Sequence, residues 1–121
     1  MPSTRKRSSA EGDALKLLRR ELALGYRVLG DNGLGLGMLA HLTARLPGSN
    51  TFWTYQLGMS VDEVRVADLA EARFDATPIQ ASHRINPSIA IHGDVYSARP
   101  DVLCVVHHHG GDGPHRHASL R

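Results

Sequence analysis

The sequence lacks the features that would place the protein outside the cell or in a membrane. Its single cysteine, Cys104, cannot form an internal disulfide, which is typical of proteins in a reducing compartment. No apolar run approaches the length of a transmembrane helix, and the N-terminus has no apolar segment of the secretory type. Charge of one sign is also scarce: 14 Lys and Arg against 12 Asp and Glu give a net charge of +2, too little to attract nucleic acid or a membrane surface. We therefore expect a cytoplasmic protein that binds neither.

The composition predicts one small globular domain with polar ends. Hydrophobic residues make up 41% and charged residues 21%, which are ordinary values, and 121 residues suffice for one core but not for two. The first residues are polar, and their short basic cluster has no aromatic neighbour, so it is more typical of a solvated tail than of a nucleic-acid site. The last residues are rich in Gly, His and Arg without apolar periodicity. We expect a disordered basic tail over 1–13, a domain over 14–109 and a disordered end over 110–121.

Apolar periodicity predicts a helix followed by strands. Apolar side chains recur every three or four residues from Ala14 to Leu29, which is the pattern of an amphipathic helix. The glycine-rich "GDNGLGLG" then ends the helix; because it leads into a strand, it is not placed to bind phosphate. "HLTARL" at 41–46 alternates as a half-buried strand does, with its polar residues on one face. "TFWTYQ" at 51–56 is a second strand, followed by a short helix over 61–69 and an edge strand over 71–76.

The second half of the sequence predicts a helix that leads into a buried strand. Asn86 can cap the helix, and Pro87 suits its first turn because proline has no N–H to leave unpaired. The helix extends to about Ala98. "VLCVV" at 102–106 is a continuous apolar run, typical of a strand that is covered on both faces. Helices before, between and beside strands favour a layered α/β domain.

Three consecutive histidines follow this apolar run. Because side chains alternate along a strand, His107 and His109 point to one face, where two imidazoles can converge on zinc or a similar divalent ion. A complete site normally has at least three protein ligands, so the alternative is a polar strand end whose histidines are hydrogen-bonded and bind no metal. For His92, on the preceding helix, we expect a hydrogen bond in or near the core rather than a ligand role.

Three segments together resemble the class II aldolase/adducin family, namely "AHLTARLPG", "TFWTYQLGMSVDEVRVADL" and "NPSIAIHGDVYSARPDVLCVVHHH". The resemblance covers residues 14–109. It implies a three-layer α/β/α sandwich, here incomplete at the C-terminus, and assembly as a homo-oligomer. It also implies a divalent metal cofactor, with zinc as the expected ion, which the family's enzymes bind through a His-x-His pair and a later histidine. The pair corresponds to His107 and His109.

The sequence departs from the family at two functional positions. The enzymes that it resembles cleave sugar phosphates by a retro-aldol reaction, in which the metal polarises the substrate oxygens and a glutamate moves protons. That glutamate lies four residues before the histidine that matches His92, where this sequence has Ser88. A serine hydroxyl cannot act as a base at neutral pH without an activating partner. The family's phosphate-binding stretch, Gly-Asn-x-Ser, corresponds to residues 40–43, where only His41 and Thr43 could hydrogen-bond an anion.

The resemblance and its departures together define two functional hypotheses. The first is a metal-binding domain related to metal-dependent lyases of the aldolase or decarboxylase type, impaired or inactive as this chain; any substrate would be a small carbonyl compound or hydroxy acid. The alternative is a non-catalytic interaction or oligomerisation domain like the adducin head. Because the later histidine is missing, we also expect a truncated or frame-shifted copy of a longer protein. The strand at 102–106 would then have one edge or face exposed.

Overall fold

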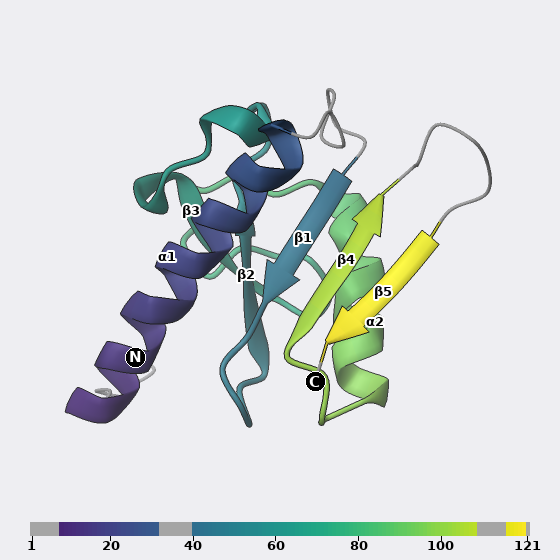
Figure 1. Cartoon of the computed structure of the whole chain (residues 1–121). Helices are drawn as coiled ribbons and strands as arrows, with labels where there is room; N and C mark the ends of the chain where they lie inside the picture. The colour runs from purple at the N-terminus through teal and green to yellow at the C-terminus, as the bar shows by residue number, and fades with distance from the viewer. Residues whose placement is uncertain (1–7, 32–39, 109–115, 121) are drawn as a thin grey trace.

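The computed structural model of the chain describes residues 8–31, 40–108 and 116–120 (Figure 1). The strands in this part form one five-stranded sheet in the order β3-β2-β1-β4-β5, and all neighbours are antiparallel. The helices and strands are α1 (Ser9–Asp31), β1 (Ala40–Ala44), β2 (Thr51–Tyr55), β3 (Leu69–Arg73), α2 (Ala90–Ala98), β4 (Cys104–His108) and β5 (Arg116–Leu120). Short 3-10 helices lie at Val61–Glu63, Val66–Asp68 and Pro87–Ile89.

Helices α1 and α2 cover opposite faces of the sheet, which confirms the predicted three-layer α/β/α sandwich (Figure 1). Each face has its own apolar core, because side chains alternate along every strand. The core under α1 contains Leu22, Tyr26, Leu42, Tyr55, Val61, Val64 and Leu69. The core under α2 contains Phe52, Ala70, Ala72, Ala76, Ile85, Ile89, Tyr96, Val102 and Val105. The apolar run of β4 is therefore shared between the two cores.

Helix α1 begins earlier than the apolar periodicity indicates. Ser8 lies immediately before the helix, and its hydroxyl accepts a hydrogen bond from the backbone N–H of Glu11 at 3.1 Å, while the Glu11 carboxylate lies 3.5 Å from the same hydroxyl. This capping arrangement extends the helix back to Ser9, so the predicted tail boundary at residue 13 lies inside the helix. Within the described residues, neither helix has the length and apolar character needed to cross a bilayer.

Two predicted elements in the middle of the chain have different bounds in the structure. In place of a helix over 61–69 there are two single 3-10 turns, because the backbone is extended at Val64 and Arg65 and the Asp68 carboxylate accepts the N–H of Arg65 at 2.9 Å. The predicted strand over 71–76 begins at Leu69 and ends at Arg73. A turn follows, because the Asp75 carboxylate accepts the N–H of Thr77 at 3.0 Å. As predicted, this strand lies at an edge of the sheet.

Strand β5 lies in the segment for which the sequence predicts disorder. Its residues pair with β4 in antiparallel register, with Cys104 opposite Leu120 and His107 opposite His117. Strand pairing uses backbone N–H and C=O groups, which almost every residue carries. The apolar pattern of this segment therefore does not predict a strand. Strand β4 consequently has a neighbour on each edge, β1 and β5, and the prediction of an exposed edge was wrong.

Gly93 is the contact point between α2 and the chain that follows β3. A Cβ atom at this position would overlap the carbonyl group of Phe74 and lie 2.7 Å from its Cα. We predict that Gly93→Ala lowers the free energy of unfolding by at least about 1–3 kcal/mol, although alanine is the better helix former. The matched control is Gly12→Ala in α1, where an added Cβ meets nothing within 4 Å. Urea unfolding should show Gly12→Ala equal to the parent or more stable by up to about 1 kcal/mol. Equal stability of both variants would contradict this packing.

The buried tyrosines predict a loss of stability at alkaline pH. Burial raises the pKa of Tyr26 and of Tyr96 well above the value of about 10 for an exposed tyrosine. The neutral phenols therefore contribute stability that is fully present below about pH 10 and is lost as the pH rises further, by about 1.4 kcal/mol per pH unit for each tyrosine. Urea unfolding between pH 8 and 11 measures this slope. Tyr26→Phe should reduce the slope, and a free energy of unfolding that stays constant to pH 11 would contradict the burial.

Candidate metal centre

Three histidines from three elements meet on the α2 face of the sheet. They are His41 of β1, His92 of α2 and His107 of β4, and one ring nitrogen from each lies within 4.8 Å of the others. The ring centroids are 6.1 Å apart for His41 and His92, 6.1 Å for His41 and His107, and 6.3 Å for His92 and His107. Among the described residues this group contains only histidines and no carboxylate.

The register of β1 on β4 brings two of these histidines together. His41 is the direct partner of His107 in the antiparallel pair, and Thr43 is the direct partner of Val105. Side chains of directly opposed residues lie on the same face of a sheet. Helix α2 packs on this face, and its His92 side chain lies beside those of His41 and His107. The polar side of the predicted half-buried strand at 41–46 is therefore buried against α2, since His41, Thr43 and Arg45 are all buried.

The cluster is largely closed to solvent. His92 is fully buried, with 0% of its surface exposed, His41 is buried and His107 is partly buried. The Nε2 atoms of all three rings are inaccessible to solvent. Neutral imidazole is a good ligand for zinc and similar divalent ions, so the chemistry of this group fits the metal that the sequence predicts.

A buried hydrogen-bond network fixes the orientation of His92. The Thr43 hydroxyl lies 2.7 Å from Nδ1 of His92 and 2.7 Å from the hydroxyl of Tyr96. Thr43 and Tyr96 are themselves fully buried, so turning the ring away would break its hydrogen bond to the Thr43 hydroxyl. His92 is thus buried and hydrogen-bonded as expected, and it also belongs to the cluster, which the sequence analysis missed.

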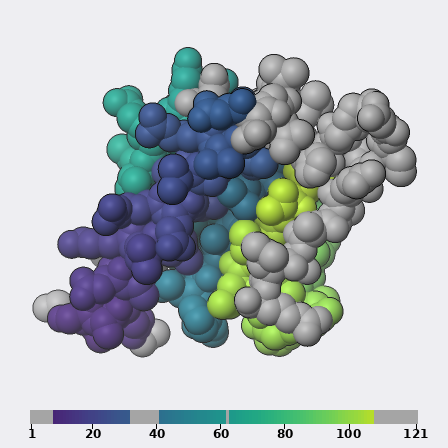
Figure 2. All heavy atoms as spheres, viewed as in Figure 1, coloured from purple at the N-terminus to yellow at the C-terminus, as the bar shows by residue number. Residues whose placement is uncertain are grey.

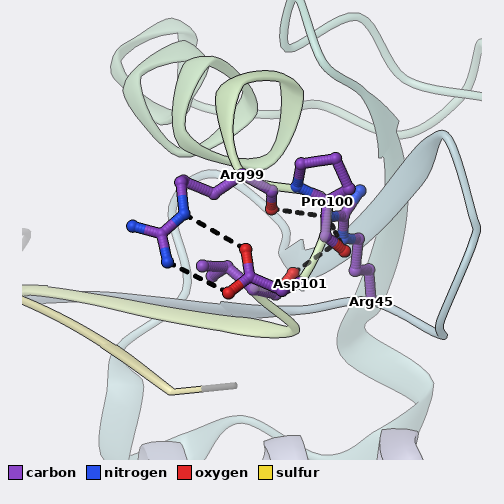
Figure 3. A network of polar contacts seen from close by, with 5 residues as sticks. Arg45, Arg99, Pro100 and Asp101 are labelled. Carbon is purple, nitrogen blue, oxygen red and sulfur yellow. Dashed lines mark hydrogen bonds and ion pairs between the residues drawn. The ribbon is translucent and has the colours of Figure 1, made fainter.

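Arg45 connects the elements that carry the histidines (Figure 3). Its guanidinium, at the end of β1, donates hydrogen bonds to the carbonyls of Arg99 at 3.1 Å, Pro100 at 3.0 Å and Val102 at 2.9 Å. These carbonyls lie between the end of α2 and the start of β4. The guanidinium also stacks over the ring of Tyr96 at 4.8 Å. One buried side chain therefore fixes β1, α2 and β4 relative to one another.

The other predicted site residues lie apart from the cluster or outside the described residues. Ser88 is exposed, and its hydroxyl donates to the side-chain oxygen of Asn86 at 3.0 Å, an amide that cannot take its proton. His109 lies outside the described residues, so its pairing with His107 stays a prediction. An anion contact by His41 and Thr43 also stays a prediction, and the hydroxyl of Thr43 already serves His92 and Tyr96.

Comparison with known proteins identifies the family. The family model for the class II aldolase and adducin N-terminal domain matches residues 20–112. The meiotically up-regulated gene 14 protein of Schizosaccharomyces pombe is 34% identical over 97 residues, which cover 78% of this chain and 38% of that protein. An L-fuculose 1-phosphate aldolase structure from Glaciozyma antarctica superimposes with a TM-score of 0.74 at 24% identity, covering 89% of this chain and 45% of that one. An aldolase II superfamily structure from Pseudomonas syringae gives a TM-score of 0.72 at 29% identity, covering 79% and 40%.

The chain spans less than half the length of each of these proteins, 38% to 45%. The matched residues nevertheless include all three clustered histidines and the elements that carry them. The chain therefore belongs to the class II aldolase and adducin family.

Proposed function

We propose that the chain is a metal-binding domain related to metal-dependent lyases of the aldolase or decarboxylase type, with impaired or absent retro-aldol activity of its own. The observation that carries the proposal is the group of three histidines on the α2 face of β1 and β4. Zinc is the proposed ion, because imidazole suits zinc and similar transition metals better than it suits magnesium or calcium. His107 and His109, which strand alternation would place on one face, are the proposed primary ligands.

The metal would supply Lewis-acid chemistry. A bound divalent ion polarises the oxygens of a carbonyl or hydroxy-acid substrate and stabilises negative charge that develops on them. Helix α2 and the buried His92 and His41 would exclude bulk water from one side of the ion. A small carbonyl compound or hydroxy acid is the substrate class that this chemistry fits.

The impairment follows from the groups that surround the proposed site. Proton transfer needs a base, and Ser88 stands where the family's enzymes have a glutamate. Its hydrogen bond goes to Asn86, which cannot activate it. The nearby carboxylates are no substitute: Asp94 is exposed on α2, and Asp101 forms an exposed ion pair with Arg99 at 3.0 Å. The isolated chain thus has the means to bind metal but lacks an assigned proton carrier.

One observation favours the alternative, an interaction or oligomerisation domain. Helix α1 lies on the face of the molecule seen in Figure 2. It exposes three large apolar side chains, Leu17, Leu24 and Val28. These residues share one side of the helix, and Leu17 and Leu24 line a groove of about 500 Å³ together with Val66. Apolar side chains grouped on a surface are typical of a protein contact. A homo-oligomer that uses this side of α1 is compatible with metal binding on the opposite face of the sheet.

The first prediction from the proposed function concerns metal content. The chelator-treated chain should bind one zinc ion, and the double variant His107→Ala/His109→Ala should bind it at least about 100-fold more weakly, because even second-shell changes cost about 10- to 100-fold. Isothermal titration calorimetry measures both. His83→Ala, outside the cluster, is the control and should match the parent. Unchanged zinc affinity in the double variant would contradict the proposed function.

The second prediction concerns turnover. The zinc-loaded chain should cleave ketose phosphates at less than about 1% of the rate of a family aldolase assayed beside it, since loss of a general acid–base group costs about 10²- to 10⁴-fold. A coupled assay for the released aldehyde measures the rate. A rapid, metal-dependent reaction would show that another residue of this chain supplies the base.

A further inference from the structure

We propose that His92 and His41 are themselves metal ligands, so that the ion is held between β1, α2 and β4 rather than by the end of β4 alone. The proposal rests on the proposed metal-binding function and specifies which residues of this chain complete the ligand set. It assigns a ligand role to His92, for which the sequence favours a structural role in or near the core. It assigns a ligand role also to His41, which the family resemblance relates only to a poorly matching phosphate-binding stretch.

The first argument is the convergence of the three rings. Two ligand nitrogens of a tetrahedral zinc site lie about 3.4 Å apart, given zinc–nitrogen distances of about 2.0–2.1 Å. The ring nitrogens of His41, His92 and His107 lie within 4.8 Å of one another before any ion draws them together. Side-chain rotations that move each ring by about 1 Å toward a common centre therefore reach ligand geometry.

The second argument is that His92 has the second-shell partner of a metal ligand. Histidines that bind metal commonly donate their other ring N–H to an oxygen, which fixes the tautomer and the ring orientation. The Thr43 hydroxyl, 2.7 Å from Nδ1 of His92, is such an oxygen. When it accepts the Nδ1–H, its own hydrogen can be donated to the Tyr96 oxygen, also 2.7 Å away. Nε2 of His92 then carries the lone pair that a metal requires. Thr43 acts here as a positioning residue.

The third argument is the number and type of donors. Ser88 stands at the position of the family's glutamate, and the predicted His-x-His pair, His107 and His109, supplies two ligands. Adding His41 and His92 gives at least three imidazoles, which is the count of a stable zinc site. A site of imidazoles without carboxylate selects zinc, cobalt or nickel and discriminates against magnesium and calcium.

The experiment is a titration of the chelator-treated full chain with Co²⁺, followed by competition with Zn²⁺. We expect the intense visible absorption of tetrahedral Co²⁺ in the parent and no effect of excess Mg²⁺. His92→Gln and His41→Gln should each weaken Co²⁺ binding at least about 10-fold and change the spectrum, because each removes a ligand. His83→Gln should change neither. Urea unfolding of each variant shows whether the fold is kept.

Variants of Thr43 distinguish a ligand role of His92 from a purely structural role. Thr43→Val keeps the shape of the side chain but removes the oxygen, so it should weaken Co²⁺ binding about 10- to 100-fold while leaving the tetrahedral spectrum in place. Thr43→Ser keeps the hydroxyl and should restore binding close to that of the parent. Equal loss in both variants would contradict a positioning role for the hydroxyl.

The outcomes separate this proposal from the proposed function. If His107→Gln abolishes binding while His92→Gln and His41→Gln bind Co²⁺ like the parent, the domain binds metal but the present ligand assignment is wrong. If none of the three variants alters binding, the proposed function fails as well. If the variants do not fold, nitrogen-15 NMR of the parent decides. Zinc should shift the ring signals of His41, His92 and His107 together, and unshifted signals of His92 and His41 would overturn the proposal.

Discussion

The hydrogen bonds of the Arg45 guanidinium are the constraint on which the candidate site depends. Arg45 is 5% exposed, and it satisfies three carbonyls of the segment that joins α2 to β4 while its plane stacks on Tyr96. A buried cation is costly unless its donors are satisfied, so this arrangement holds the segment in one position. Because β1, α2 and β4 each carry one histidine of the cluster, the spacing of the three rings is set by this one contact and by the register of β1 on β4.

The same face of the sheet accounts for the proposed combination of metal binding with impaired retro-aldol activity. The proposed ligands come from elements that Arg45 and the strand register fix, whereas a base at position 88 would come from an exposed residue in the middle of the Pro87–Ile89 turn. Replacing a glutamate by serine there leaves the cluster untouched but removes a proton carrier. The two properties are therefore physically separable. The proposal therefore allows such a domain to bind an ion, to use α1 as a contact surface and to turn over no sugar phosphate.

Local patterns in the sequence were sufficient for the helices and for the buried strand. The apolar spacing between Ala14 and Leu29 and the run "VLCVV" depend on neighbouring residues only and correspond to α1 and β4. The cap at Asn86 is equally local, but it begins the 3-10 turn Pro87–Ile89, and α2 follows from Ala90. The cluster could not be predicted in the same way. His41 and His107 meet because of an antiparallel register between distant segments, and the alternation of "HLTARL" shows which residues share a face but not what covers it. β5 was not predicted for a related reason: it pairs with β4 through backbone groups, and its own residues show no apolar pattern.

X-ray absorption at the zinc edge of the zinc-loaded chain tests the central claim most directly, since it counts the imidazoles around the ion in the unmodified protein. If β1, α2 and β4 are held so that their histidines share one ion, the spectrum should require at least three imidazole nitrogens at about 2.0–2.1 Å, and His92→Gln should lower that number by one. A shell of two or fewer imidazoles completed by oxygen, unchanged in His92→Gln, would contradict the account.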